Sequence, residues 1–166
     1  MKVFEGLEGI GMSERATRKF LTQSRSNLLL ATINVDGTPT IHPVWYYFDT
    51  IRTKLYFYTG PTLRKATNIK KRSQVYFDVD DDSWPYKGVK GKGSAKILTA
   101  KQEALSWGVK ILARYTKKGS PLFETALDRM KNGGYVIIEI TPAYFTSWDF
   151  AKLERQTGSL RDSIIS

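Results

Sequence analysis

Two adjacent cations, Arg64 and Lys65, follow a turn that ends a run of β-forming residues. The run is Lys54 to Thr59, and Gly60-Pro61 comes directly after it. The residues from Thr62 to Ile69 favour a helix with both cations in its first turn. Free amides at a helix N-terminus attract anions, and adjacent cations strengthen that attraction. We therefore expect the phosphate group of a bound cofactor at this strand-turn-helix.

Further groups at this turn could contact the same phosphate. Thr59 would offer its hydroxyl group, and residues 60 to 63 would offer backbone amides, with Thr62 as a helix cap. Arginine adds bidentate geometry and lysine a point charge. Asn68 lies four residues after Arg64 and so faces the same side of the helix. The alternative is an ordinary solvated helix face, with Asn68 as a surface amide, because three more basic residues follow.

A predicted hairpin precedes this turn and positions it. Leu28 to Val35 is rich in β-branched and aliphatic residues, Asp36-Gly37 follows, and Thr38 to Phe48 is again β-forming. An Asp-Gly step between such runs is a strong hairpin signal, because glycine accepts the positive φ of a tight turn. We expect Ala31–Val35 to pair antiparallel with Thr38–Trp45.

Three later runs complete the predicted sheet. Gln74 to Val79 alternates cleanly, Tyr86 to Leu98 forms a long glycine-rich run, and Tyr135 to Thr141 is apolar. An extension of the last run beyond Pro142, from Tyr144 to Trp148, would follow a kink. Six strands that do not alternate with helices predict a mainly β (α+β) fold, a six-stranded antiparallel split β-barrel with helices at its side.

The helices should begin at identifiable caps. A first helix is predicted from Ser13 to about Gln23, and a second from Thr99 to about Lys118, where Gln102 completes a capping box. A third opens at Ser120-Pro121. The first twelve residues have little periodicity and predict a loose arm, and the tail from Lys152 is polar. No linker divides the chain, so residues 1–166 are expected to form one domain.

Composition excludes several classes of site. The chain of 166 residues has no cysteine and a single histidine, which excludes disulfides, thiolate chemistry and a histidine-based metal site. The formal net charge of +10 suits nucleic acid, an anionic membrane or an acidic small molecule, and equally a solvated surface. No long apolar segment is present, so the default expectation is a cytoplasmic protein without membrane partners.

Four segments follow one another in a recognisable order. They are Ala31-Thr32-Ile33-x-x-Asp36-Gly37-x-Pro39, His42-Pro43-Val44-Trp45-Tyr46, Leu55-Tyr56-Phe57-x-Thr59-Gly60 and Arg64-Lys65-x-x-Asn68-Ile69. In this order they resemble the pyridoxamine 5′-phosphate oxidase-like flavin-binding split barrels, over roughly the middle two-thirds of the chain. The resemblance implies a homodimer that binds FMN, or a deazaflavin instead, at the subunit interface.

The resemblance also implies which residues meet the cofactor. The strand around Pro43 would lie along the flavin ring and meet its polar edge with backbone groups. Since proline cannot donate to a sheet ladder, this segment should be irregular or at a sheet edge. A late aromatic segment would reach the cofactor region, often across the dimer interface. The candidate cofactor-binding residues are His42, Pro43, Val44, Trp45, Tyr58, Thr59, Gly60, Arg64, Lys65, Asn68 and Trp148.

Simpler interpretations exist for several of these residues. His42 could be a packed barrel residue, and a lone imidazole does not identify a catalytic base. Trp148 and Tyr144 could belong to the core or to an interface. Lys90, together with the other lysines of its strand, at positions 92 and 96, could line a basic entrance for an acidic substrate or form a solvated strand face.

The predicted chemistry is hydride transfer to or from a small organic substrate, carried by the cofactor. The oxidase branch of the family has a further phosphate-contacting basic residue where this chain has His42-Pro43-Val44-Trp45. The chain therefore looks more like the branch with uncharacterised flavin proteins and deazaflavin-dependent reductases. No residue is identified as an acid-base catalyst. Alternatives are a non-catalytic flavin carrier or sensor, and a nucleic-acid-binding β-barrel.

Overall fold

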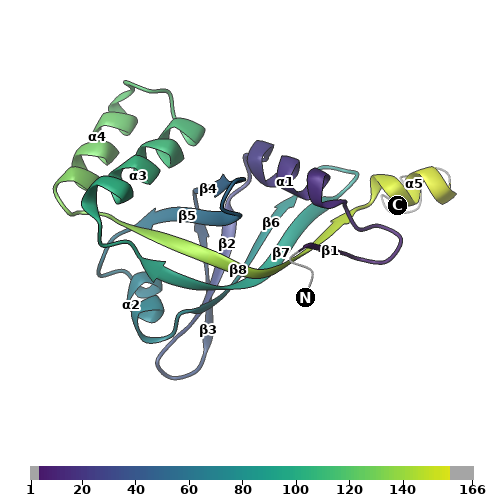
Figure 1. Ribbon diagram of the computed structural model, residues 1–166, viewed down its shortest axis with the longest axis horizontal. Helices are drawn as coiled ribbons and strands as arrows, with labels where there is room; N and C mark the ends of the chain where they lie inside the picture. The colour runs from purple at the N-terminus through teal and green to yellow at the C-terminus, as the bar shows by residue number, and fades with distance from the viewer. Residues whose placement is uncertain (1–3, 158–166) are drawn as a thin grey trace.

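All six predicted runs are strands of one sheet in the computed structural model, which describes residues 4–157 (Figure 1). The strands are β1 (Phe4–Gly6), β2 (Leu28–Ile33), β3 (Pro39–Val44), β4 (Tyr46–Asp49), β5 (Lys54–Thr59), β6 (Gln74–Asp81), β7 (Lys87–Ile97) and β8 (Val136–Asp149). The helices are α1 (Glu14–Gln23), α2 (Arg64–Lys71), α3 (Lys101–Tyr115), α4 (Pro121–Lys131) and α5 (Ala151–Thr157).

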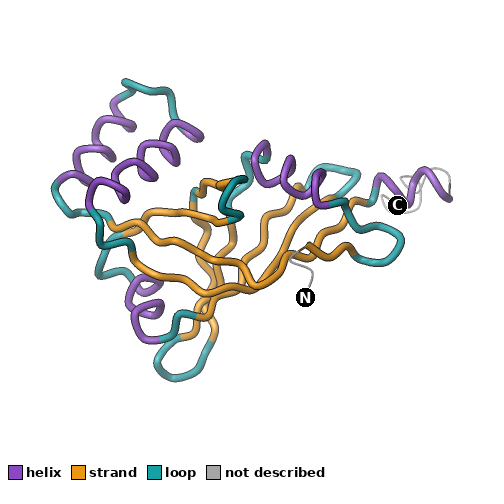
Figure 2. The backbone as a smooth tube through the Cα atoms, viewed as in Figure 1, coloured by secondary structure: helices purple, strands orange, loops and turns teal. Residues whose placement is uncertain are grey.

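The predicted run Thr38–Phe48 is divided at Trp45 into β3 and β4. These two strands lie at opposite ends of the order β3-β2-β6-β7-β8-β5-β4. Because only Trp45 separates them, the chain itself links the two ends of the sheet, which curls into a split barrel (Figure 2). The predicted fold class is confirmed, with β3 and β4 as one bent strand and β1 as an addition.

The predicted antiparallel pairing of the hairpin is confirmed. β2 and β3 are antiparallel, with Ala31 opposite Ile41 and Ile33 opposite Pro39. Gly37 has a φ of 88°, in the left-handed region that the turn requires. The Asp36 carboxylate accepts the backbone N–H of Thr38 at 2.9 Å, which fixes the turn further.

The loose arm predicted at the N-terminus is wrong from residue 4 onward. β1 pairs in parallel with residues 145 to 147 of β8, and the Leu7 amide donates to the Ser147 carbonyl at 3.0 Å. The chain then turns back on itself so tightly that a Cβ on Gly11 would lie 2.1 Å from the Gly6 Cα. The glycines at positions 6 and 11 permit this close backbone crossing.

Two of the four predicted helix caps are confirmed. The Ser13 side chain accepts from the Ala16 amide at 3.2 Å, and Ser120 caps α4 through the Phe123 amide. The caps expected from Thr62 and Thr99 are wrong, because α2 and α3 begin one residue later than expected, with Leu63 and Ala100 at the cap positions. Each threonine therefore stands one residue too early to reach the amides of the first turn.

Helices α3 and α4 cover one outer face of the barrel, over β4, β5 and β8 (Figure 1). There the Tyr56 and Trp107 rings stack with centroids 3.9 Å apart. The outer face of β2, β3 and β6 is different, because Leu29, Ile41 and Tyr76 are 36, 65 and 44% exposed. We call this second surface the open face. Within residues 4–157, no helix is long and apolar enough to span a membrane.

Candidate functional site

The N-terminus of α2 combines a cation that lacks a counter-ion with free backbone donors. Lys65 is half-buried, burial lowers its pKa, and within residues 4–157 its ammonium group has no ion pair or hydrogen bond. Arg64 beside it is exposed. The amides of Thr62, Arg64 and Lys65 also have no acceptor among the described residues. An anion here would gain charge-assisted hydrogen bonds.

The strand that leads into this turn contributes an unpaired hydroxyl. Thr59, the last residue of β5, is 3% exposed, and its Oγ1 is buried without a hydrogen-bond partner among the described residues. Gly60 follows, and its carbonyl accepts from the Leu63 amide at 3.2 Å, which closes the turn before α2. A buried hydroxyl that lacks a partner is costly, and such groups often mark a place for a ligand or water.

His42 belongs to the same end of the barrel. Its Nε2 lies 3.4 Å from the Thr32 hydroxyl on β2. Burial lowers the pKa of His42, and the nearby charges of Lys65 and Arg64 lower it further. The imidazole is therefore neutral at pH 7 and reports on the charge balance of the α2 terminus.

Asn68 is buried between α2 and the end of β2. It is 4% exposed, and its Nδ2 donates to the Thr32 Oγ1 at 3.0 Å and to the Asn34 Oδ1 at 2.9 Å. The Asn68 amide group thus holds α2 against β2 and the turn that follows it, and a surface amide is excluded. Asn68 orients the helix that carries Arg64 and Lys65, and its contact with a phosphate stays a prediction.

The segment from Pro43 to Trp45 is only partly open to a ligand. β3 ends the strand order, so the predicted sheet-edge position of Pro43 is confirmed. The Val44 side chain points into the barrel core. Trp45 stacks on Tyr115 of α3 at 5.0 Å and contacts Tyr58 edge-on. Any cofactor contact of Trp45 or Tyr58 must therefore be made beneath α3 and α4, or through the backbone.

Trp148 lies on a different part of the molecule from α2, near the end of β8 that leads to α5 (Figure 1). Its ring lies flat on Gly88, where a Cβ would come within 2.2 Å of the indole. The Lys90 ammonium sits 5.9 Å from the ring centre. Within one subunit Trp148 and Lys65 are not brought together, so a shared cofactor would need the Trp148 of a second subunit.

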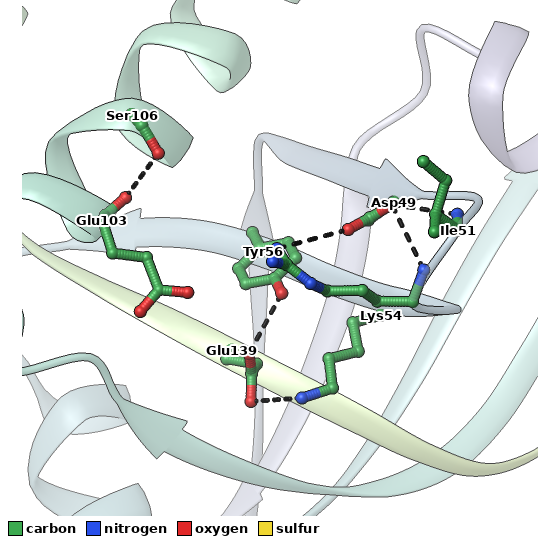
Figure 3. A network of polar contacts seen from close by, with 8 residues as sticks. Asp49, Ile51, Lys54, Tyr56, Glu103, Ser106 and Glu139 are labelled. Atoms are coloured by element: carbon green, nitrogen blue, oxygen red, sulfur yellow. Dashed lines mark hydrogen bonds and ion pairs between the residues drawn. The ribbon is translucent and has the colours of Figure 1, made fainter.

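A second polar cluster, shown in Figure 3, is satisfied internally. Glu139 of β8 accepts from the Lys54 ammonium at 2.9 Å and from the Tyr56 hydroxyl at 3.0 Å. The Lys96 ammonium lies 3.4 Å from the same carboxylate. Burial favours a higher pKa for Glu139, but these donors outweigh burial and hold its pKa below the usual range. Because all of its contacts are made within the protein, we assign the Glu139 carboxylate a structural role and not a catalytic one. It also forms an ion pair with Lys96, which is largely exposed.

Sequence reasoning missed a pocket of about 450 Å³ on the open face. Its lining includes Ile41, Tyr76, Asp78, Lys90 and Tyr144. Asp78 was not noticed because a polar residue on an alternating strand indicates solvent exposure. The only available signal was Tyr76, an aromatic residue on the supposedly solvated side.

The single histidine makes the α2 site measurable by NMR. We expect the His42 pKa to lie below 6.5 in the protein without ligand, and to rise when FMN binds, because a phosphate would offset the charges of Lys65 and Arg64. A titration of the imidazole Cε1–H signal measures both values. Riboflavin, which lacks the phosphate, is the control and should change the pKa less. A pKa at or above 6.5 without ligand would contradict the expected charge environment.

The chain was compared with known proteins. The family model described as pyridoxamine 5′-phosphate oxidase matches residues 13–149. No curated protein sequence matches the chain. Among solved structures, the conserved hypothetical protein Rv2991 from Mycobacterium tuberculosis is 29% identical, with a TM-score of 0.77 over 90% of this chain and 92% of that one.

Two other solved structures extend this comparison. A protein named F420 reductase is 26% identical, with a TM-score of 0.60 over 76% of this chain and 94% of its own. HutZ, the heme storage protein from Vibrio cholerae, is 14% identical, with a TM-score of 0.59 over 87% of this chain and 94% of its own, and shares the fold alone. The match of the family model over most of the chain identifies this protein as a member of the pyridoxamine 5′-phosphate oxidase family.

Proposed function

We propose that this protein is a homodimeric oxidoreductase that binds FMN, or a deazaflavin, and transfers hydride to or from a small organic substrate. The cofactor phosphate would lie at the N-terminus of α2, held by Lys65, Arg64 and the free amides of that turn, with the Thr59 hydroxyl behind them. When bound, the cofactor supplies the hydride chemistry. The protein supplies the phosphate contacts, the backbone groups of the edge strand β3, and a surface that excludes water.

The observation that carries this proposal is the half-buried Lys65 ammonium without a counter-ion. A desolvated cation is unfavourable unless an anion accompanies it. Here it lies beside free amides at a helix N-terminus, and no carboxylate of the described residues forms an ion pair with it. This arrangement fits a phosphate better than it fits a solvated helix face.

A deazaflavin is the second candidate for the cofactor. It is favoured by the structural likeness to the protein named F420 reductase, at 26% identity. Both candidates present a flat tricyclic ring and a phosphate-bearing chain, so the α2 terminus alone does not discriminate between them. Discrimination would come from the groups that face the ring.

The proposed homodimer would use the open face. Leu29, Ile41 and Tyr76 are apolar and exposed there, Tyr144 lines the same pocket, and the Trp148 ring lies beside Lys90 of that pocket. An exposed apolar surface of this kind marks an interface with a partner. A two-fold dimer would also bring a second Trp148 toward the cofactor. A cytoplasmic location stays an expectation from the sequence.

The test is the visible absorption spectrum of the protein purified without added cofactor, followed by titration with FMN and with a deazaflavin. Bands of an oxidised flavin, or saturable binding of either compound, support the proposal, and absence of binding of both overturns it. Turnover with a nicotinamide donor and an artificial acceptor then separates an oxidoreductase from a non-catalytic carrier or sensor.

A further inference from the structure

A directed chain of hydrogen bonds runs from the turn of the β2–β3 hairpin to α2. The Asp36 carboxylate accepts from the Thr38 hydroxyl at 2.6 Å, and Thr38 Oγ1 accepts from Asn34 Nδ2 at 3.0 Å. The Asn34 Oδ1 is then left to accept from Asn68 Nδ2 at 2.9 Å. The bonds from Thr38 lower the pKa of Asp36, so this carboxylate is ionised at pH 7. Because an ionised carboxylate only accepts, the direction of every bond in the chain follows from Asp36, and so does the orientation of both side-chain amides.

The chain continues from Asn68 to His42 through Thr32. Asn68 Nδ2 also donates to the Thr32 hydroxyl oxygen at 3.0 Å, and this oxygen lies 3.4 Å from His42 Nε2. Thr32 is 1% exposed, and among residues 4–157 its hydroxyl has no other hydrogen-bond acceptor. A buried hydroxyl that does not donate is unfavourable, so Thr32 donates to Nε2. The neutral imidazole of His42 therefore carries its proton on Nδ1.

His42 lies on the face of β3 that is directed toward the barrel interior. It stands opposite Leu30 in the β2–β3 register, and Leu30 and Thr32 are both buried on the inner side of β2. Burial and the charges of Lys65 and Arg64 lower the pKa of the imidazole, so it is close enough to α2 to sense both cations. Its Nδ1 makes no hydrogen bond within the described part of the chain. A neutral N–H donor thus stands beside two cations, which cannot accept from it.

We propose that Thr32 is a positioning residue that holds His42 as the Nδ1–H tautomer, and that this neutral N–H donates to the anionic group bound at the N-terminus of α2. An imidazolium at this place would add a third positive charge, which Lys65 and Arg64 would repel. The neutral tautomer supplies a donor without that charge. The donor role rests on the proposed function, in which the anionic group is the cofactor phosphate, whereas the tautomer does not.

The tautomer can be measured directly, because His42 is the only histidine of the chain. In ¹⁵N-labelled protein without added cofactor, the long-range ¹H–¹⁵N cross-peaks of the ring show which nitrogen carries the proton. At about pH 8, where the imidazole is neutral, we expect Nδ1–H as the main form in the wild-type protein. Histidine in water favours the Nε2–H form, so a predominant Nδ1–H form indicates a hydrogen bond to Nε2.

Two substitutions at Thr32 separate the hydroxyl from the rest of the side chain. Thr32→Val keeps the shape and removes the hydroxyl, so the preference for Nδ1–H should be lost. The same variant should bind FMN about tenfold more weakly, because the imidazole proton is no longer held on Nδ1, while riboflavin binding changes much less. Thr32→Ser keeps the hydroxyl and should preserve both the Nδ1–H form and the affinity for FMN.

A second variant tests whether Thr32 acts through His42. Thr32 also accepts from Asn68, so Thr32→Val could weaken FMN binding by shifting α2. His42→Phe removes the imidazole donor and leaves the contact between Thr32 and Asn68 in place. We expect His42→Phe to weaken FMN binding about as much as Thr32→Val does, and Thr32→Val to have little further effect in the His42→Phe background.

The Nε2–H form in the wild-type protein would overturn the inference, as would an Nδ1–H form that survives Thr32→Val. Effects of Thr32→Val and His42→Phe on FMN affinity that simply add would overturn the action of Thr32 through His42. Because the tautomer is measured without cofactor, the two proposals fail separately. A wild-type protein with the Nδ1–H form and no FMN binding would overturn the proposed function and the donor role with it. FMN binding with the Nε2–H form would overturn this inference alone.

Discussion

Replacing Lys65 by Ala should weaken FMN binding by about tenfold or more, while riboflavin binding changes much less. A phosphate at the N-terminus of α2 would gain charge-assisted hydrogen bonds, each worth roughly 1.5–3 kcal/mol. Loss of one such bond corresponds to about a factor of ten in the dissociation constant, or more. The burial that lowers the Lys65 pKa reduces competition from water, so this cation should contribute more than an exposed one. Fluorescence quenching titrations of both flavins measure the difference.

Lys70→Ala provides the matched control for this prediction. Lys70 is exposed in the last turn of the same helix, so the variant removes the same charge at the other helix end. It should bind FMN nearly as well as the wild-type protein. Unchanged FMN affinity in Lys65→Ala would remove the phosphate site from α2. An equal loss for FMN and riboflavin would mean that Lys65 supports the fold or the ring instead.

The sheet could be predicted because its signals are local. Alternation from Gln74 to Val79 and the Asp36-Gly37 turn specify strand type and pairing within a few residues. The pairing of β1 was missed because it is parallel and joins residues about 140 positions apart, and no local pattern encodes such a contact. The division at Trp45 was also missed, since a bend to the opposite sheet edge depends on the closed topology.

The candidate site, too, could be predicted only where its residues are close in sequence. The cations of α2 belong to one continuous strand-turn-helix, and the sequence places them together. The sequence did not predict that Trp45 and Tyr58 pack beneath α3 and α4, and their contact with the cofactor stays a prediction. Asp78 was overlooked for a related reason. Which outer face the helices cover is decided by tertiary packing, so sequence alone does not separate a solvated strand residue from one in an apolar pocket.

The open face is the proposed subunit interface. In a two-fold dimer each residue of the interface occurs twice, so one substitution acts at two places. Ile41 is well suited as a probe, because it is 65% exposed in one subunit and should tolerate a polar replacement without loss of folding.

We expect Ile41→Glu to convert the dimer to a monomer at micromolar concentration. A cost of about 1.4 kcal/mol for each buried glutamate would raise the dimer dissociation constant about a hundredfold, and an unpaired charge in an apolar interface costs more than that. Loss of the dimer should also lower the affinity for FMN, although Lys65 and the α2 turn remain intact. Sedimentation equilibrium measures the mass, and thermal unfolding followed by circular dichroism checks the fold.

Ile51→Glu is the control, because Ile51 is 93% exposed in the turn between β4 and β5, outside the open face. That variant should remain a dimer and bind FMN normally. A wild-type protein that is monomeric with the cofactor still bound would refute the interface altogether. A dimer of Ile41→Glu as tight as the wild-type dimer would place the interface elsewhere on the barrel. Monomeric Ile41→Glu with unchanged FMN affinity would confine the cofactor to one subunit, because the contacts at α2 would then suffice without a second Trp148.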